Sequence, residues 1–427
     1  MEIKAKGKLC FDVVVCGGGF AGVSAAVSAA REGVKVLLVE AGGELGGDIT
    51  KSIVPQILDA AGKGGIVSEL FSFLNEGHHT SVRLGERLDE NGKNLPGAMV
   101  DLEYVKYYLD KICLDAGVTV IYHSSVIHAE LQNSQITSIL IAGEAGAYAA
   151  EGKVFVDATG NGALAGLCGC DFSFGHPESK HPQPCSTALL VTGIDESVSQ
   201  TDTNADKDAL KQKMTDCGIS VSAEWIALVK LPQRNCWLLT FNNQYDVDPD
   251  DTLSISRATS EARIECIEVV DKMRGIHGFE GMEIVSTSSH IGVREGKRIS
   301  GHYTLTYDDV TGGSRFDDAV CKARFPIDVH VISKDDTTDH KKGKSVTGYH
   351  IPYRSLLPRD CENLLLAGRC ISGDFYAHAS YRVAGNVIPM GEAAGYAAAA
   401  CVKNGSLPFE IDGKEIRREM ESRGYEI

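Results

Sequence analysis

Short runs of consecutive apolar residues recur near both ends of the chain, separated by segments of helical periodicity. The apolar runs predict buried strands at residues 11–16, 36–39, 118–122, 136–141, 154–156 and 363–367. Residues 102–116 predict an amphipathic helix, whose apolar face carries Val105, Tyr108, Leu109, Ile112 and Cys113. This alternation predicts an α/β fold whose sheet carries inserted antiparallel strands.

The pattern changes between residues 175 and 348. Polar stretches at 195–208 and 334–344, which we interpret as solvated loops, alternate with a strand at 236–241 and a helix at 254–273. The α/β alternation returns with the strand at 363–367 and a helix dense in alanine and glycine at 391–401. We therefore predict a discontinuous nucleotide-binding domain at 1–174 and 349–427. A substrate or cap domain with a mixed or antiparallel sheet is predicted at 175–348, with 48–100 as a further candidate part of the cap.

The first predicted strand leads into a glycine-rich turn, an alanine-rich helix and a second strand that ends at Glu40. In such a unit Gly17 makes the tight turn, Gly19 lets a pyrophosphate approach the backbone, and Gly22 lets the helix pack on its strand. The helix N-terminus then faces the phosphates, and Glu40 accepts the ribose hydroxyls. Strand, helix, strand and acid together predict a dinucleotide site.

Further segments rich in small residues predict contacts to the same ligand. Gly46 and Gly47 follow the ribose-binding acid, and a strand at 154–157 ends in a small-residue turn. Residues 160–165 repeat the GxGxxA spacing, but no acid ends a strand some twenty residues later, so we interpret them as a second contact to the first dinucleotide. Near the C-terminus, a loop at 367–374 and a helix opening at 391–395 complete the set, because a helix N-terminus stabilises negative charge.

Composition narrows the range of partners. The formal net charge of -16 argues against nucleic acid, and the longest apolar stretch, 387–402, is too short to span a bilayer. Thirteen cysteines without C-x-x-C spacing indicate a reducing cytoplasm, and the first apolar run belongs to the dinucleotide unit rather than to a secretory signal. His78, His79 and His340 lack metal-ligand spacing, so we expect no metal.

In their order along the chain, these motifs resemble the FAD-dependent oxidoreductases of the glutathione-reductase-like flavoprotein superfamily. They are distantly similar to the fumarate reductase and L-aspartate oxidase flavoproteins. The segments that carry the resemblance are 17–22 with Glu40, 46–47, 157–160, 291–295, 351–358, 363–372, 380–383 and 391–400. The resemblance implies a Rossmann-like FAD-binding domain with an inserted cap domain, and FAD as the cofactor.

The resemblance also implies how the FAD contacts divide. The glycine-rich turn and Glu40 would hold the ADP half, Val126 the adenine, and Thr159 with its neighbours the pyrophosphate. Asp374 or its neighbours would contact the ribityl chain, while the helix at Gly391 would face the flavin ring and stabilise its reduced form. The expected cofactor contacts are Gly17, Gly19, Phe20, Ala21, Gly22, Glu40, Ala41, Gly46, Gly47, Val126, Ala158, Thr159, Gly160, Gly373, Asp374 and Gly391.

Basic and aromatic side chains beside these motifs are candidates for substrate chemistry. Arg382 ranks first, because it lies between the ribityl loop and the flavin-facing helix and because arginine clamps carboxylates in bidentate fashion. His378 is a candidate general base. Arg294, Tyr381 and His290 complete the set, and a structural role is the alternative for each.

These features predict an FAD-dependent oxidoreductase that transfers a hydride between the flavin and a small polar metabolite, which is an alcohol, an amine or an activated alkene. Three alternatives stay open at this stage: a flavoprotein subunit that passes electrons to a partner protein, a nicotinamide-dependent dehydrogenase, and a nucleotide-binding module without activity. Besides the small-molecule substrate, the expected partners are a second copy of the chain or an electron-acceptor protein.

Overall fold

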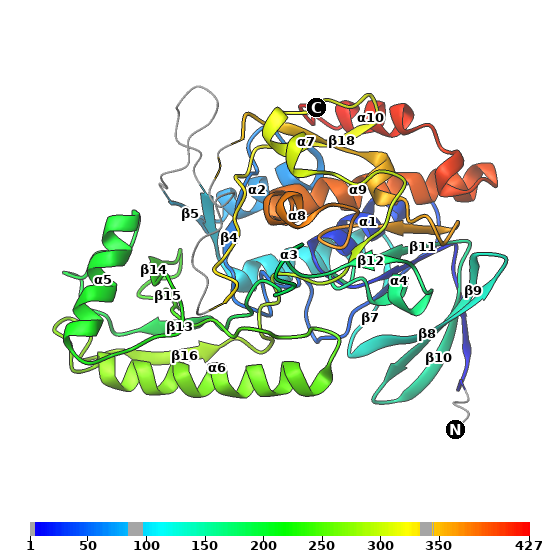
Figure 1. The fold of residues 1–427 in the computed structure, drawn as a ribbon. Helices are drawn as coiled ribbons and strands as arrows, with labels where there is room; N and C mark the ends of the chain where they lie inside the picture. Colours follow the sequence, from blue (N-terminus) through cyan, green and yellow to red (C-terminus); the bar gives the residue numbers. More distant parts are fainter. Residues whose placement is uncertain (1–4, 84–96, 334–343, 345) are drawn as a thin grey trace.

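The structure is a computed structural model that describes residues 5–83, 97–333, 344 and 346–427 (Figure 1). The polar run predicted at 334–344 lies outside the described residues, except for Lys344.

A five-stranded parallel sheet forms the centre of the molecule, in the order β20–β11–β2–β3–β7. Its strands are β2 (Val13–Cys16), β3 (Val36–Val39), β7 (Thr119–Ile121), β11 (Val154–Asp157) and β20 (Leu364–Leu366). All residues of β2, β3, β11 and β20 are buried, which is why these strands appear as unbroken apolar runs. Because every pairing is parallel, the loops that follow the strands leave from one edge of the sheet. The predicted α/β fold class is confirmed.

Two long helices pack against each other and against this sheet: α1 (Phe20–Arg31) and α9 (Ala384–Asn404) (Figure 1). The predicted amphipathic helix is α3 (Leu102–Asp115), and all five residues of its predicted apolar face are buried. Asp101 caps α3, because its carboxylate accepts the N–H of Glu103 at 3.0 Å.

The start predicted for the last long helix, Gly391, is wrong. Helix α9 begins earlier, at Ala384, and contains Pro389 in its interior. Gly391 instead lies where α9 crosses α1, and a Cβ there would come within 2.1 Å of the carbonyl oxygen of Ala21. The small residues of this segment therefore allow two helices to approach closely, and they do not mark a helix N-terminus.

The predicted antiparallel insertion is a sheet in the order β1–β10–β9–β8. Its strands are β1 (Lys8–Cys10), β8 (Ser124–Gln132), β9 (Gln135–Gly143) and β10 (Gly146–Glu151). A small three-stranded sheet has the order β4 (Gln56–Ile57), β6 (Gly97–Val100) and β5 (Thr80–Arg83). Two further sheets have two strands each: β12 (Phe172–Ser173) with β17 (Arg298–Ile299), and β18 (Ala319–Ala323) with β19 (Tyr349–Pro352). The shorter helices are α2 (Gly65–Glu76), α4 (Ala163–Leu167), α7 (Tyr307–Gly312), α8 (Phe375–Tyr381), α10 (Gly413–Ser422), η1 (Tyr353–Leu356) and η2 (Pro408–Glu410).

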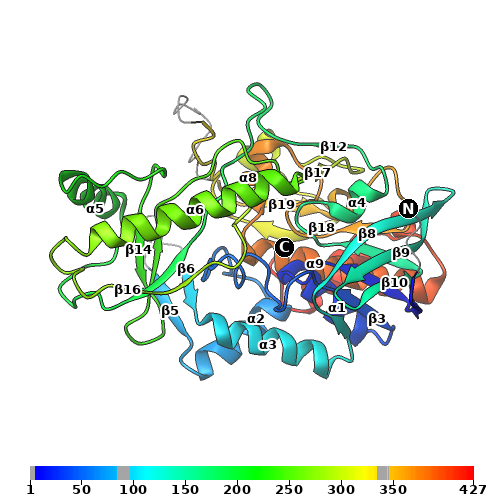
Figure 2. The ribbon, with the colours of Figure 1, turned by 90° about the horizontal axis from the view of Figure 1, so that it is seen from below.

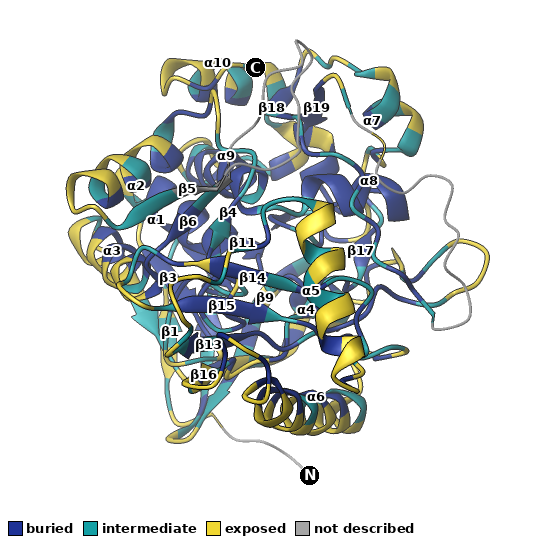
Figure 3. Cartoon of the chain, turned by 90° about the vertical axis from the view of Figure 1, so that its left-hand side faces the viewer, coloured by how far each residue is buried: buried dark blue, intermediate teal, exposed yellow. Residues whose placement is uncertain are grey.

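A separate antiparallel sheet lies on the side of the molecule away from α1 (Figures 1 and 2). Its order is β14–β15–β13–β16, formed by β13 (Leu189–Thr192), β14 (Ala227–Lys230), β15 (Trp237–Thr240) and β16 (Glu283–Thr287). With α5 (Asn204–Asp216) and α6 (Thr252–Met273) it encloses its own hydrophobic core, while the outer faces of both helices are exposed (Figure 3). We call these elements the cap.

The buried residues of the cap core come from a shorter stretch of the chain than the predicted cap domain at 175–348. They lie between Leu189 and Met282, whereas Ile299, Val320 and Ile327 pack in the larger core with the parallel sheet. Part of the polar run predicted as a loop at 195–208 is also helical, because α5 begins at Asn204. Thr203 and Asp206 form a capping box that satisfies the first N–H groups of this helix.

Candidate functional site

The glycine-rich turn joins β2 to α1 at the edge where the parallel strands end. Gly17 has φ of +100°, and a Cβ there would lie 2.4 Å from the carbonyl oxygen of Ala158, so the position requires glycine. Gly19 is the N-cap of α1 and has no side chain to bond the N–H groups of the first turn, at Phe20 and beyond. A Cβ on Gly19 would meet only the Cα of Gly47, at 3.8 Å. The open space above Gly19 is a cradle that fits a phosphate against these amides.

Glu40 lies beside this turn at the end of β3 and is 2% exposed. One carboxylate oxygen accepts the N–H of Gly18 at 2.8 Å, and the other accepts the N–H of Gly42 and the Nζ of Lys51, the latter at 2.6 Å. The acid therefore holds the position that ribose recognition requires. The structure identifies Lys51 as a further residue beside this acid, which sequence analysis missed because no motif marks it.

The second glycine loop lies directly against the first. Gly46 donates its N–H to the carbonyl oxygen of Gly18 at 2.9 Å, and an isolated parallel bridge joins Gly46 to Gly19. Gly46 and Gly47 both have positive φ, at +107° and +60°. The structure thus brings the loops after β2 and β3 side by side.

Asp157 organises the turn that follows β11. It is fully buried, and its carboxylate accepts the N–H and the hydroxyl of Thr159 at 3.0 and 2.7 Å and the N–H of Ala165 at 2.8 Å. Burial raises the pKa of Asp157 above its ordinary value, while these hydrogen bonds act in the opposite direction. The acid holds Thr159 and Gly160 at the same edge of the sheet as the glycine-rich turn.

Arg369 links three of the loops at this edge. Its Nη1 donates to the carboxylate of Asp48 at 2.5 Å, and its Nη2 donates to the Oδ1 of Asn161 at 2.9 Å. A Cβ on Gly160 would lie 2.7 Å from the guanidinium carbon of Arg369, so the loop after β11 accommodates this side chain only with glycine. Together, the backbone cradle, the buried acid and the converging small-residue loops fit FAD.

Two predicted cofactor residues lie in regular elements or cap them. The carboxylate of Asp374 accepts the N–H groups of Tyr376, Ala377 and Tyr307, at 2.9, 2.8 and 2.6 Å, so this side chain caps α8 and holds α7. A ribityl contact from its neighbours stays a prediction. Val126 lies partly buried in β8, opposite Ile141, and its contact with adenine also stays a prediction.

His378 and Arg382 lie together at the junction of α8 and α9. His378 is fully buried, and both its ring nitrogens lack a hydrogen-bond partner in the described part of the chain. The Nη2 of Arg382 donates to the backbone oxygen and the carboxylate of Asp328 at 3.0 and 3.2 Å, whereas its Nε has no partner there. Burial, followed by the charges of Arg298 and Arg382, lowers the pKa of His378 well below its usual value, so the imidazole is neutral.

Arg294 approaches the same region from the cap side. Its Nη1 donates to the carbonyl oxygen of Pro184, and burial followed by the charge of Arg382 lowers its pKa to about 10. His330 lies close enough to both arginines to feel their charges, and burial and then the charge of Arg294 lower its pKa to about 4. Asp328 and His330 were missed by sequence reasoning because their segment has no motif and no regular element.

Of the other two catalytic candidates, Tyr381 lies beside His378, with the two ring centroids 5.6 Å apart. Tyr381 is fully buried, and its hydroxyl donates to the carbonyl oxygen of Ile371 at 3.0 Å. Its ring also fills the space that a Cβ on Gly373 would need, which is a packing role, and a catalytic role for Tyr381 stays a prediction. His290 is exposed and donates its backbone N–H to the carbonyl oxygen of Lys51 at 3.2 Å, beside the cofactor loops rather than beside Arg382.

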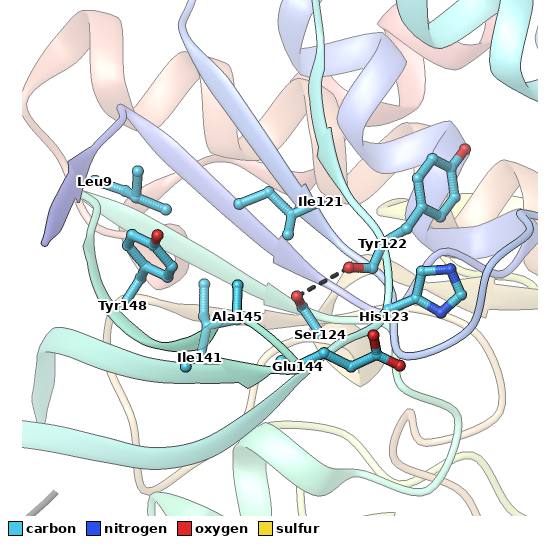
Figure 4. Close-up of a pocket in the computed structure, with 11 residues that line it drawn as sticks. Leu9, Ile121, Tyr122, His123, Ser124, Ile141, Glu144, Ala145 and Tyr148 are labelled. Atoms are coloured by element: carbon cyan, nitrogen blue, oxygen red, sulfur yellow. Dashed lines mark hydrogen bonds between the residues drawn. The ribbon is translucent and has the colours of Figure 1, made fainter. Parts of the chain in front are cut away.

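A cavity of about 370 Å³ lies between β7 and the antiparallel insertion (Figure 4). Leu9, Ile121, Ile141 and Tyr148 give it an apolar wall, and none of the candidate catalytic residues lines it. Within the described ranges, no group of three or more metal-ligating side chains occurs. The helices of that same part of the chain include none with the length and hydropathy of a membrane span.

Comparison with known proteins finds a relative that matches part of the chain and solved structures of similar fold. The tRNA uridine 5-carboxymethylaminomethyl modification enzyme MnmG of Aquifex aeolicus is 30% identical over 140 residues, which is 30% of this chain and 21% of that protein. A geranylgeranyl bacteriochlorophyll reductase-like protein of Thermoplasma acidophilum superposes with a TM-score of 0.51 at 12% identity, covering 98% of this chain and 85% of the other. The p-nitrophenol 4-monooxygenase PnpA of Pseudomonas putida gives 0.50 at 12% identity, over 97% and 84%. At these identities the structural likeness shows a shared fold.

The family comparison covers nearly the whole chain. The model of the FAD dependent oxidoreductase family matches residues 12–420, which include the glycine-rich turn, the cap and the segment around Arg382. The cradle at Gly19, the acid at Glu40 and this match agree on the cofactor, which is FAD. The protein is an enzyme of the FAD-dependent oxidoreductase family.

Proposed function

We propose that this enzyme transfers a hydride between FAD and a small polar metabolite bound where the cap meets the FAD-binding half, beside Arg382 and His378. The observation that carries the proposal is the set of buried polar atoms without partners. The two ring nitrogens of His378 and the Nε of Arg382 lack hydrogen bonds in the described structure, although buried polar groups are nearly always satisfied. Such atoms point to a polar ligand that completes them.

The cofactor loops and these side chains have different tasks in the proposed reaction. When bound, FAD supplies the acceptor or donor of the hydride. Arg382 would orient the substrate through its guanidinium, whose Nη2 is held in place by Asp328. His378, neutral and shielded from water, would take the hydroxyl or amine proton that an oxidised alcohol or amine releases. For the reduction of an alkene, His378 would first have to take up a proton, which it would then give to the substrate carbon.

The low pKa of His378 bears on this role. The positive charges of Arg298, Arg382 and Arg369 disfavour its protonated form, which makes the free imidazole a weak base. A negatively charged substrate beside Arg382 would offset part of this repulsion and raise the pKa of His378 toward the working pH. The proposed base would therefore become competent only when substrate is present.

The proposal is tested by the visible spectrum of the purified protein, followed by an anaerobic screen for metabolites that bleach or restore the flavin bands. We expect bound flavin and at least one polar metabolite that changes its redox state. Flavin that no polar metabolite reduces, and that no alkene reoxidises after chemical reduction, would contradict the proposed reaction while leaving the family assignment intact.

A further inference from the structure

Arg294 carries a positive charge that forms no ion pair with a described carboxylate, although the charge of Asp328 acts on it from a greater distance. The guanidinium donates to the carbonyl oxygen of Pro184, and no Asp or Glu of the described chain lies within ion-pair distance of it. The nearest acid in sequence, Glu295, is bound to Arg298 and to the N–H groups of Gly175 and Gln183. A partly buried charge without a counter-ion is costly, unless a ligand supplies the opposite charge.

A chain of contacts connects Arg294 to Arg382. Pro184, which binds Arg294, follows Gln183, and the Oε1 of Gln183 accepts the backbone N–H of His330 at 3.3 Å. The ring of His330 lies 3.5 Å from the carboxylate of Asp328, which also binds Arg382. The two arginines, one from the cap side and one from the end of α8, therefore face one small region.

Among the residues that the structure describes, the charges of this region do not balance. Arg294 and Arg382 contribute two positive charges, and Asp328 contributes one negative charge. His330 and His378 are neutral near pH 7, because burial lowers both pKa values, followed by the charge of Arg294 at His330 and by the charges of Arg298 and Arg382 at His378. One positive charge is left over at the place where the proposed reaction would occur.

Two of the unsatisfied groups in this region have the same bias. The Nε of Arg382 and the Nε2 of Gln183 are buried without partners in the described structure, and both are donors. Gln183 is 2% exposed. A neutral carbonyl or hydroxyl ligand would satisfy these donors but would leave the charge uncompensated, whereas an anion satisfies both requirements.

We infer that Arg294, Arg382 and Gln183 form an anion subsite that binds a carboxylate group of the substrate. The inference rests on the proposed function, because it concerns the substrate of the same site. A carboxylate matches the flat, forked guanidinium and carries the single charge that the region lacks. Arg294 thereby becomes a residue that selects substrates with an acidic group and excludes their neutral analogues.

The test is a binding titration on the protein as purified, by isothermal titration calorimetry, and in parallel by the visible difference spectrum of the bound flavin. Acetate, glycolate and malonate are the probes, and acetamide is the neutral control, all at one ionic strength. We expect saturable binding of at least one carboxylate and none of acetamide. Arg294→Gln should weaken carboxylate binding by about tenfold or more, because it removes a charge-assisted contact.

Two further variants keep the test decisive. Arg294→Lys retains the charge without the fork and should bind with intermediate affinity, which also controls for a folding defect in Arg294→Gln. Arg257→Gln removes one positive charge from the exposed surface of α6 and should bind like the unmodified enzyme. Thermal melting of each variant would show whether the fold is preserved.

Several results would overturn the inference. The first is the absence of carboxylate binding by the unmodified enzyme. The second is an Arg294→Gln variant that binds carboxylate as tightly as the unmodified enzyme. The third is an Arg257→Gln variant whose carboxylate affinity falls as much as that of Arg294→Gln. A lowered flavin reduction potential in Arg294→Gln with unchanged carboxylate binding would also overturn it, because Arg294 would then face the flavin. Calorimetry reports anion binding whether or not flavin is retained, so a failed subsite is distinguishable from a failed redox function.

Discussion

The two ends of the proposed active site differ in the chemical groups that form them. At the cofactor end, glycine-rich loops approach one another through backbone atoms, and the buried acids Glu40 and Asp157 are fully hydrogen-bonded. At the substrate end, long charged side chains converge from the cap and from α8, and several of their nitrogens lack partners in the described structure. The first end presents backbone N–H groups at fixed positions, whereas the second lacks a counter-charge among the described residues.

This difference shows what each end is able to recognise. A preformed cradle of backbone amides binds a phosphate through positions that no side chain needs to supply. A cluster of unpaired donors selects ligands by their charge. Its donors are satisfied only when a suitable substrate binds. Substitutions at the two ends should therefore fail in different ways.

The largest effect is expected at the cradle. Gly19→Val places a branched side chain in the open space above the first turn of α1, where we propose that the pyrophosphate lies. Overpacking of this kind costs about 1–3 kcal/mol or more, which is roughly ten- to a hundredfold in affinity, so the purified variant should lack flavin yet remain folded. The absorbance ratio of flavin to protein checks this. Gly312→Ala is the control, because nothing lies within 4 Å of a Cβ there; full flavin content in Gly19→Val would refute the cradle.

At the substrate end, Arg382→Gln should retain flavin and lose turnover by about a hundredfold, a loss typical of removing one positioning contact. Steady-state kinetics on whichever metabolite bleaches the flavin would measure it. Asp328→Asn breaks the ion pair between Asp328 and Arg382 but keeps the guanidinium, so this variant should lose less turnover than Arg382→Gln. If both variants lose activity equally, the pair serves folding rather than the substrate.

A substitution where α9 crosses α1 should change the stability of the fold rather than the binding of flavin. Gly391→Ala forces a methyl group to within 2.1 Å of the carbonyl oxygen of Ala21, so α9 must move away from α1. We expect the free energy of unfolding to fall by about 1–3 kcal/mol in urea titrations. Unchanged stability would mean that the two helices are less closely packed than described.

The last effect is a dependence of stability on pH. Burial raises the pKa of Glu392, whose carboxylate accepts the N–H of Ile66 and the hydroxyl of Tyr425, to about 7 from its ordinary 4.5. The native state then holds a proton that the unfolded chain releases, so stability should fall as pH rises from about 4.5 to about 7 and then level off. At about 1.4 kcal/mol per pKa unit, the loss is at most roughly 3 kcal/mol.

Glu392→Gln should remove this pH dependence and leave the variant more stable at pH 8. Urea unfolding at several pH values would measure the difference, and Glu261→Gln on the exposed face of α6 is the matched control. A slope that persists in Glu392→Gln would assign the pH dependence to another group.

Sequence reasoning succeeded where a local pattern and a local structure coincide. The runs that became β2, β3, β11 and β20 are buried on both faces, so their apolar character was visible without any neighbour. It failed at α9, where small residues that resembled a helix start serve a contact with α1 far away in the chain. It also failed at Asp328 and His330, whose importance comes only from what surrounds them.

Residues close together in the chain were enough to predict the α/β fold, the glycine-rich turn and the acid at Glu40, because each depends on local backbone geometry that only certain residues adopt. The three-dimensional structure was needed to show that the ring of Tyr381 packs against Gly373, that Asp374 caps α8 and that the charge of Arg382 acts on Arg294. These outcomes depend on burial and on charges brought together from segments far apart along the chain. Such long-range contacts leave no periodic or spaced signal in a single sequence.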